Sequence, residues 1–297
     1  MQLYQTREDK IFNWINIVLI GIFTLVILYP LLFVVFASLS DPTKIFDNPV
    51  LLWPQGFTLE GYKRVFENPD IWMGFKNAVI YTVLGTAINV VMTTLAAYPL
   101  SRSDFRGRNV ITILFTFTMF FSGGLIPTYL VNQALGIVNT MWVMVLPGAI
   151  SVYNMIIMRT YFQQNIPKEL EESAFIDGAT DMQLLVKVVL PLSTPIIAVM
   201  MMFYGVGRWN GYFDAMIYLS DRELFPLQLI LREILVQNQM GDAANQAIMG
   251  SGQSEVNMIK QSIKYAVVIV SSLPVLIFYP IVSKYFEKGI MVGAIKG

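Results

Sequence analysis

The chain contains no cysteine and no histidine, and each absence removes a class of chemistry. Without cysteine, no disulfide bond or thiol nucleophile is available. Without histidine, most zinc sites and every serine–histidine–carboxylate triad are excluded. The sequence also lacks a Gly-x-x-x-x-Gly-Lys-Ser/Thr loop, which would cradle ATP phosphates. We therefore expect no catalytic residue, no metal site and no cofactor bound by this chain itself.

Charged residues are scarce as well. They make up 13% of the 297 residues, whereas a soluble domain carries roughly 25%. Hydrophobic residues make up 55%, and the mean hydropathy is +0.58, which indicates a membrane protein. Twenty basic residues balance twenty acidic ones, so nothing in the charge suggests binding to nucleic acid.

Runs without any charged residue mark the candidate membrane spans, since a helix needs about 20 apolar residues to cross a bilayer. The run at 109–158 is long enough for two spans, with a turn near residues 132–136. Backbone groups in lipid must bond within their own segment, so the spans should be helices. The sequence thus predicts an all-α, polytopic protein with six transmembrane helices. The runs are residues 11–40, 77–101, 109–158, 188–207 and 265–283.

Orientation follows from the basic residues in short loops. The loop at residues 102–108 holds three arginines, whereas the turn between spans three and four holds none. This places the arginine loop, both termini and the loop around Glu172 in the cytoplasm. The predicted organisation is a cytoplasmic N-terminus (1–10), a six-helix domain (11–287) and a cytoplasmic tail (288–297). Within the domain, a cytoplasmic loop spans 161–181 and external loops span 41–76 and 208–264. An amphipathic helix is expected at 225–237.

A polar stretch at residues 166–181 lies between strongly apolar segments. Pro167 suits the first turn of a helix, and the glutamates that follow favour the positive end of the helix dipole. Gly178 is suited to the left-handed conformation that ends a helix. Thr180 and Gln183 have the spacing of a capping box that opens the next helix. The sequence predicts a short helix over 167–177, a sharp turn, and then a long apolar helix.

This stretch resembles the cytoplasmic coupling loop of ABC importer permeases. The family motif is Glu-Ala-Ala, two residues and Asp-Gly-Ala, followed by an apolar helix with a proline. Here residues 172–179 are Glu-Ser-Ala-Phe-Ile-Asp-Gly-Ala, and Leu190-Pro191 stands at the later position. Ser173 departs from the motif but is still small. The alternative is that the stretch is only a connector between two spans.

The resemblance covers nearly the whole chain and is most similar to maltose-type, MalG-like carbohydrate permeases. The ending at 288–297 is similar to the branch that handles complex oligosaccharides and uronate-containing fragments. The other matching segments are residues 96–102, 105–108, 122–129, 136–140 and 209–210.

The resemblance implies a type I ABC importer in a bacterial plasma membrane. A second homologous permease would complete the pore, an ABC ATPase dimer would bind ATP and Mg²⁺, and an extracellular solute-binding protein would deliver an oligosaccharide. The short helix would dock on an ATPase subunit and couple it to the pore. The residues implied in this coupling are Glu172, Ser173, Ala174, Asp177, Gly178 and Ala179.

Sugars are bound by aromatic faces and by amide or hydroxyl groups. Trp209, Asn210 and Tyr212 stand where span five is expected to meet the outside, and Tyr153 and Asn154 lie within span four. A polar group inside a membrane usually faces a cavity or another helix. Aromatic residues at a span end are also typical of an interfacial belt. These five residues are therefore candidates for the substrate path, with belt and packing roles left open.

Three other functions remain as alternatives. The chain could import another solute, such as a peptide or a polyol. It could be a stand-alone secondary transporter, although such proteins often place ionisable residues in the membrane, and the charge-free runs lack them. A membrane-embedded enzyme would need paired carboxylates or Ser/Lys in the spans. Either of the last two would be active without an ATPase partner, which discriminates them from a permease subunit.

Overall fold

A computed structural model describes residues 6–41, 44–45, 52–236 and 263–280 of the chain. These residues form helices and connecting turns, with no strand in the described ranges. The predicted tail at 288–297 and most of the second half of the predicted external loop, residues 237–262, lie outside the described part. The chain divides into two compact units. One holds residues 1–69 and 233–272, and the other holds residues 70–232 and 273–297.

The first unit is built on α1 (Arg7–Ser38). A capping box opens α1, in which the Thr6 hydroxyl accepts from the Asp9 N–H at 3.2 Å and the Asp9 carboxylate accepts from the Thr6 N–H at 2.9 Å. At its other end, the Ser38 hydroxyl bonds the Tyr62 hydroxyl of α3 (Glu60–Glu67) at 2.7 Å. Most apolar side chains along α1 are exposed. Such an extended apolar surface is one that a bilayer or another chain covers.

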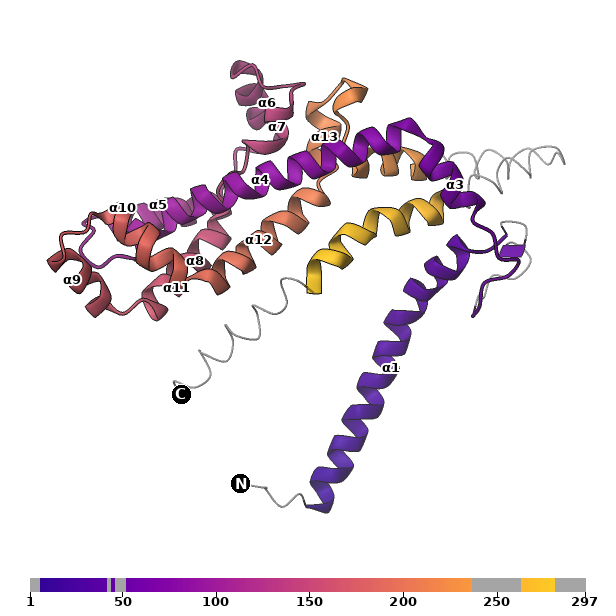
Figure 1. Cartoon of the computed structure of the whole chain (residues 1–297), viewed down its shortest axis with the longest axis horizontal. Coiled ribbons are helices and arrows are strands. Elements are labelled where there is room, and N and C mark those ends of the chain that lie inside the picture. The colour runs from indigo at the N-terminus through magenta and orange to yellow at the C-terminus, as the bar shows by residue number, and fades with distance from the viewer. Residues whose placement is uncertain (1–5, 42–43, 46–51, 237–262, 281–297) are drawn as a thin grey trace. The chain divides into compact units, whose positions relative to one another are not determined.

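The second unit is organised around α4 (Pro69–Ser101), which lies alongside three other helices (Figure 1). At one end of this group are α9 (Lys168–Ile176) and α10 (Asp181–Leu184), the elements of the predicted coupling loop. The start of α4 lies at the other end. The three helices that accompany α4 are α5 (Arg108–Phe120), α8 (Val152–Asn165) and α12 (Thr194–Trp209).

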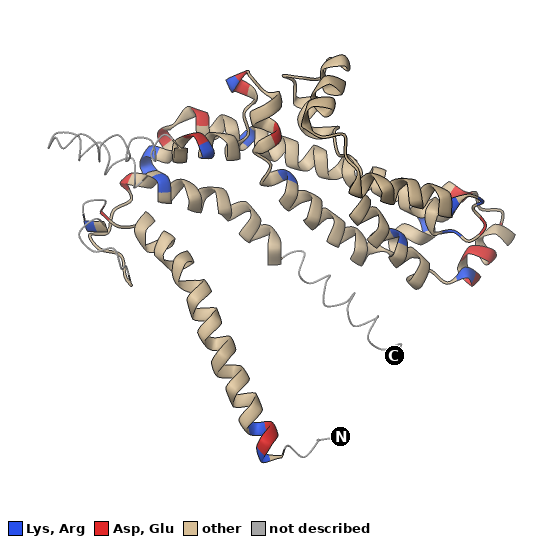
Figure 2. Cartoon of the chain, turned by 180° about the vertical axis from the view of Figure 1, so that it is seen from behind, with Lys and Arg blue, Asp and Glu red and all other residues tan. Residues whose placement is uncertain are grey.

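Three helices of the described chain are long and apolar enough to cross a membrane on their own: Arg7–Ser38, Pro69–Ser101 and Ile263–Pro280. The number rises to five if each of two bent helix pairs counts as one span. Helices α5 and α6 (Leu125–Ala134) form one pair, bent by 114°, and Asp181–Leu192 and α12 form the other, bent by 83°. Charged residues are sparse along these helices and gather towards their ends (Figure 2). The polytopic, all-helical prediction is confirmed, but the count of six continuous spans is not reproduced exactly.

The two bends have identifiable causes. At the first, Gly124 has φ +83°, a conformation that side-chain-bearing residues rarely adopt. At the second, Leu185–Val189 forms a π-helical turn, and Pro191 and Pro195 remove backbone donors around Ser193. Span three and the start of span five are therefore bent elements.

The predicted fourth span is broken. Helix α7 (Met141–Val145) ends six residues before α8 begins at Val152, and the intervening segment 146–151 is irregular. It contains Pro147 and Gly148, and Gly148 has φ +67°. Every residue in the segment is uncharged, so the charge-free run gave no sign of the break. Irregular backbone at membrane depth needs hydrogen-bond partners from elsewhere in the protein.

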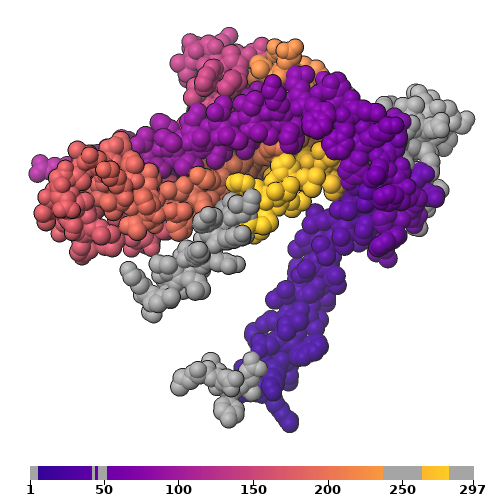
Figure 3. Space-filling view, in the orientation of Figure 1, coloured from indigo at the N-terminus to yellow at the C-terminus, as the bar shows by residue number. Residues whose placement is uncertain are grey.

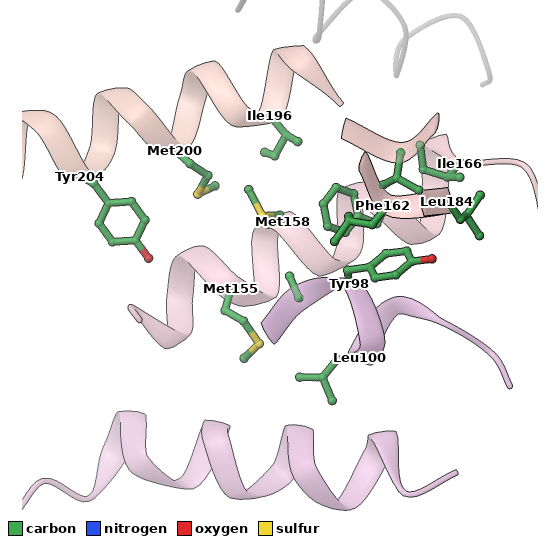
Figure 4. Close-up of a cluster of buried hydrophobic side chains, with 13 residues drawn as sticks. Tyr98, Leu100, Met155, Met158, Phe162, Ile166, Leu184, Ile196, Met200 and Tyr204 are labelled. Atoms are coloured by element: carbon green, nitrogen blue, oxygen red, sulfur yellow. The ribbon is translucent and has the colours of Figure 1, made fainter. Parts of the chain in front are cut away.

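The core of the second unit is a cluster in which helices α8, α4 and α12 meet the α10–α11 segment (Figure 4). Met155, Met158 and Met200 are completely buried in it. Methionine is unbranched and flexible, so it fills gaps between helices that cross at irregular angles. Other buried members are Tyr98, Leu100, Phe162, Ile166, Leu184, Ile196 and Tyr204.

A second cluster lies beside α4, where α6, α7 and α13 (Phe213–Tyr218) form a lobe (Figure 3). Tyr81 of α4 donates to the Leu224 carbonyl at 2.9 Å, and the Asn77 amide donates to the Glu223 carbonyl at 2.7 Å. Helix α4 begins at Pro69, so the predicted external loop 41–76 ends within a helix.

The amphipathic helix expected at 225–237 is present over residues 227–236, as far as the structure describes it. Leu227, Ile230 and Leu231 are buried, so the apolar face of this helix packs on the protein. A Cβ added at Gly74 of α4 would lie only 2.5 Å from Ile230 Cδ1, which shows how closely the two elements approach.

Candidate functional site

Helix α9 has the bounds that the sequence predicted, within one residue at each end. Pro167 is its N-cap residue and Asp177 its C-cap residue. The Gly178 N–H donates to the Phe175 carbonyl at 3.0 Å, and the Ala179 N–H donates to the Ala174 carbonyl at 2.9 Å. This is the Schellman arrangement, with Gly178 at φ +79°. Both of these hydrogen bonds, which close the turn, join backbone groups.

The next helix starts as predicted. The Thr180 hydroxyl accepts from the Gln183 N–H at 3.3 Å, and the Gln183 side chain accepts from the Thr180 N–H at 2.9 Å. A Schellman turn followed directly by a capping box leaves only four residues between α9 and α10, with Asp177 to Ala179 forming the cap and turn and Thr180 forming the next cap. The angle between the two helices is therefore closely fixed by local hydrogen bonds.

The six residues of the predicted coupling motif divide by exposure. Glu172, Ser173, Asp177 and Gly178 are exposed, whereas Ala174 and Ala179 are partly buried. Ala174 packs against the core cluster of its own unit, so its small size serves the seating of α9 on that core. The exposed side of α9 also presents Ile176, which is 86% exposed and was not among the predicted residues.

One side chain, Arg102, joins the arginine loop to α9 and α10. Its Nε and Nη2 donate to the two oxygens of Asp104 at 2.9 and 2.6 Å. Its Nη1 donates to the Tyr98 hydroxyl at 3.1 Å and lies 3.9 Å from a Glu171 oxygen and 3.6 Å from an Asp181 oxygen. The guanidinium carbon also lies 5.0 Å from the centroid of the Phe175 ring. The Arg102 side chain is only 9% exposed.

This arrangement shifts the protonation of its members. The hydrogen bond from Arg102 lowers the pKa of Asp104, and the bond to Asp104 raises the pKa of Arg102. Burial raises the pKa of Glu171, and the positive charge of Arg102 offsets part of that effect. Glu171 is thus a carboxylate whose desolvation outweighs its pairing.

Three more side chains secure the end of α4. Arg159 donates to the Leu100 carbonyl at 2.8 Å, Arg108 donates to the Arg102 carbonyl at 2.9 Å, and Gln163 donates to the Ser101 carbonyl at 3.3 Å. The last carbonyls of a helix have no partner within the helix, and cations are favoured there by the helix dipole. Arg159 and Gln163 therefore hold the end of α4 against α8, and Arg108 bonds the loop that follows α4.

A second polar cluster lies deep in the unit, around Arg208 of α12. Its guanidinium donates to the carbonyls of Met144 at 2.7 Å, Pro147 at 3.0 Å and Val145 at 3.2 Å. It also donates to the Asn89 side-chain oxygen from Nη2 at 3.1 Å and from Nε at 3.3 Å. These carbonyls belong to the end of α7 and to the irregular segment after it. Arg208 supplies the hydrogen bonds that the broken span lacks.

Two further side chains complete the support of the break. The Asn89 amide donates to the Gly148 carbonyl at 2.9 Å. The Ser151 N–H donates to the Tyr204 hydroxyl at 3.1 Å, and that hydroxyl shares a 2.6 Å hydrogen bond with Thr93. Segment 146–151 is thus hydrogen-bonded to α4 and α12, so the break is a stabilised part of the fold.

The five predicted substrate-path residues lie in different environments. Tyr153 is 57% exposed on α8, whereas Asn154 beside it is buried, with its N–H donating to the Ser151 hydroxyl at 3.4 Å. Trp209 is buried, and its ring stands edge-on to Phe75 at 5.8 Å. Asn210 is the exposed C-cap residue of α12.

Tyr212, the fifth of these residues, is 41% exposed, and the Arg232 guanidinium lies 5.7 Å from its ring centroid. A groove of about 550 Å³ runs between α4, α12 and residues 274–278, and Trp209 is the one predicted substrate-path residue among its described lining. The groove is almost entirely apolar. Thr82 and Thr86 line it, and their hydroxyl oxygens have no hydrogen-bond partner within the described part of the chain.

Sequence reasoning missed the contacts made by Asn89, Arg102, Tyr204 and Arg208. A signal existed for Asn89 and Arg208, because Asn89 is a polar residue inside an apolar run and Arg208 directly ends one. Arg102 contributed to the sequence analysis only as one of the basic residues that predict orientation. The pairing of residues far apart in the chain had no signal in a single sequence.

Comparisons with known proteins follow these observations. No family model matches the chain. The chain is 37% identical to the protein LplC of Bacillus subtilis (strain 168), over 99% of this chain and 98% of that protein. It is 39% identical to the polygalacturonan/rhamnogalacturonan transport system permease protein YtcP of the same organism, over 98% of this chain and all of that one.

A solved structure agrees with these relatives. It is the crystal structure of a bacterial ABC transporter involved in the import of the acidic polysaccharide alginate. One chain of that structure matches with a TM-score of 0.84 and 34% identity, covering 96% of this chain and 100% of the other.

Proposed function

The chain belongs to the family of carbohydrate ABC importer permeases, and on that premise we propose that α9 docks on the ATPase and couples its cycle to the pore. As a permease subunit of a sugar importer the chain is not an enzyme, and ATP hydrolysis belongs to a separate subunit. Such importers work with a partner permease, an ATPase and a solute-binding protein. The relatives do not favour a stand-alone transporter or a different solute class.

The observation that carries the coupling proposal is the construction of α9. Its ends are fixed by Pro167 and by the Schellman turn at Gly178, and its inner side is seated on the core through Ala174. Its outer side is free to meet a partner, with Glu172 and Ser173 exposed beside Ile176. A short helix held at both ends transmits a displacement as a rigid body. Coupling through Glu172, Ser173, Ala174, Asp177, Gly178 and Ala179 is favoured over a plain connector.

For the substrate we propose an acidic oligosaccharide. The similar permease is named for polygalacturonan and rhamnogalacturonan, and the similar solved transporter for alginate. In this chain, support comes from Arg232, whose guanidinium lies over the ring of Tyr212. Aromatic faces with a nearby cation suit a uronate ring. Tyr153, Asn154, Trp209, Asn210 and Tyr212 are proposed to line the path.

We also propose the topology. The chain is a multi-pass protein of the bacterial inner membrane, and the arginine loop favours a cytoplasmic position for α9 and for both termini. That position is the one from which α9 can meet an ATPase.

The coupling proposal is tested by reversing one exposed charge on α9. We expect Glu172→Lys to weaken docking, so that ATP hydrolysis stimulated by binding protein loaded with oligogalacturonate falls about fivefold or more, the lower end of typical coupling. The measurement uses the assembled importer in nanodiscs, with assembly checked by pull-down of the ATPase. Glu8→Lys, the same reversal in the exposed first turn of α1, is the matched control. Parent-like stimulation in Glu172→Lys would remove the coupling role.

The substrate proposal has its own test. Uptake of oligogalacturonate and of a neutral maltooligosaccharide is compared in cells expressing the importer. Preference for the neutral sugar would overturn the acidic assignment and leave the coupling proposal standing.

A further inference from the structure

We propose that Arg102 is the positioning residue that holds α9 against the end of α4. A force exerted on α9 by a partner then reaches α4 as well as α12. This inference rests on the proposed coupling role of α9. Helix α9 is joined to α12 along the chain, through α10, the π-helical turn and α11 (Leu190–Leu192). Its link to α4 has no such covalent route and depends on side chains.

Arg102 is placed to provide that link, because it follows α4 directly and contacts both α9 and α10. On α9, the guanidinium carbon of Arg102 lies 5.0 Å from the centroid of the Phe175 ring, and its Nη1 lies 3.9 Å from a Glu171 carboxylate oxygen. At the start of α10, an Asp181 carboxylate oxygen lies 3.6 Å from the same Nη1. In the last turns of α4, Arg102 contacts Tyr98 by a 3.1 Å hydrogen bond and with its guanidinium 5.9 Å from the ring.

The role of Asp104 is to orient the guanidinium. Its two oxygens accept from Nε and Nη2, which is the bidentate geometry that fixes the plane of an arginine head. That leaves Nη1 directed at Tyr98, Glu171 and Asp181. A lysine at this position would keep the charge but lose the planar fork and the stacking on aromatic rings.

The environment makes these contacts effective. The Arg102 side chain is 9% exposed and Glu171 is 21% exposed, so the pair is screened less by solvent than surface ion pairs are. Asp181, at 74% exposed, contributes less. The contact with Phe175 attaches α9 to the guanidinium at a second point beside Glu171.

The inference predicts a change in helix position that can be measured without any partner. The chain has no cysteine, so spin labels can be attached at Ser103→Cys and Lys168→Cys, both at exposed positions beside α4 and on α9. We expect Arg102→Gln to broaden the distance distribution between the labels, and Arg102→Lys to broaden it less. Arg106→Gln removes the same charge from an exposed position in the same loop and serves as the control.

The second readout is function in the assembled importer without labels. We expect Arg102→Gln to lower hydrolysis stimulated by oligogalacturonate-loaded binding protein about fivefold or more, and Arg106→Gln to leave it unchanged. If Arg102→Gln does not fold, Glu171→Gln provides the same test from the α9 side.

Each outcome decides the matter. Broader distances together with lower stimulation support the positioning role. Distances like those of the parent overturn it, even if Glu172→Lys has shown that α9 couples. A broader distance distribution with normal stimulation of ATP hydrolysis also overturns it, because coupling would then not depend on the contact made by Arg102. If Glu172→Lys leaves stimulation intact, the proposed function fails on its own evidence, and the distance result still reports on the position of α9.

Discussion

Arg208 of α12 donates two hydrogen bonds to a single oxygen of Asn89 on α4, from Nη2 at 3.1 Å and from Nε at 3.3 Å. The other end of the same amide donates to the Gly148 carbonyl at 2.9 Å. Asn89 is 1% exposed. One buried side chain, Asn89, thus connects the cation at the end of α12 to the backbone of the broken span.

We expect Asn89→Ala to destabilise the protein by about 2–3 kcal/mol, because it leaves a buried guanidinium and a carbonyl short of partners. The measurement is the free energy of unfolding of the purified chain in detergent. Asn132→Ala is the matched control, since Asn132 is also buried but its amide nitrogen has no hydrogen-bond partner in the described residues. Equal losses in the two variants would contradict the bridging role of Asn89.

We expect Gly178→Val to disturb the Schellman turn, because a β-branched residue resists φ +79°. The expected cost is of order 1–3 kcal/mol locally, with a matching loss of substrate-stimulated ATP hydrolysis in the assembled importer. Gly21→Val in α1, where an added Cβ would meet no atom within 4 Å, is the control. Normal stimulation in Gly178→Val would mean that the angle of α9 is unimportant.

A pH dependence follows from Glu171, whose pKa is raised by burial. A carboxyl with a folded-state pKa above its unfolded value costs stability once it ionises. The cost is absent below the unfolded pKa and is fully present above the folded pKa. Glu171→Gln should therefore raise the melting temperature at pH 7, with the difference vanishing as the pH falls to about 4, near the unfolded pKa. Glu169→Gln, which makes the same change at an exposed position on the same helix, is the control.

The outcome that contradicts this account is a melting temperature of Glu171→Gln below that of the parent at pH 7. The pairing with Arg102 would then outweigh the desolvation of Glu171. The predicted gain in stability and the predicted loss of coupling in the same variant have opposite signs, so the two effects are separable in one protein.

Topology is open to direct labelling because the chain has no cysteine. In intact cells, Lys168→Cys should be protected from a membrane-impermeant thiol reagent, and Glu223→Cys, in the turn before residues 227–236, should react. Both residues are exposed. After the cells are opened, both cysteines should react. Labelling of Lys168→Cys in intact cells would reverse the orientation that the arginine loop predicts.

Local signals in the sequence predicted the helix, turn and capping box of residues 167–184 well. Pro167, Gly178 and Thr180 act on the backbone next to them, so their effect does not depend on distant parts of the chain. The inward side of α9 was not predicted, because only the folded core shows that Ala174 packs within its own unit.

The membrane region was predicted less completely, for a physical reason. A charge-free run indicates that a segment enters the bilayer but not that its helix is continuous. Pro147 and Gly148 were the visible sign of the break, yet they are uncharged and did not interrupt the run. The stabilising partners, Asn89 and Arg208, stand far from the break in sequence, so the irregular segment and its support became apparent only together.

The close approach of Arg208 to Gly85 makes the two positions genetically interdependent. A Cβ added at Gly85 would lie 3.1 Å from Arg208 Nε and 3.2 Å from its Cδ, so a larger residue at 85 must move the guanidinium stem. Moving the stem disturbs the carbonyls of Met144 and Pro147 on a third segment. A larger residue at position 85 should therefore perturb the backbone of the broken span. A shorter side chain at position 208 would leave room for the added Cβ, so the same substitution at 85 should then lose this effect.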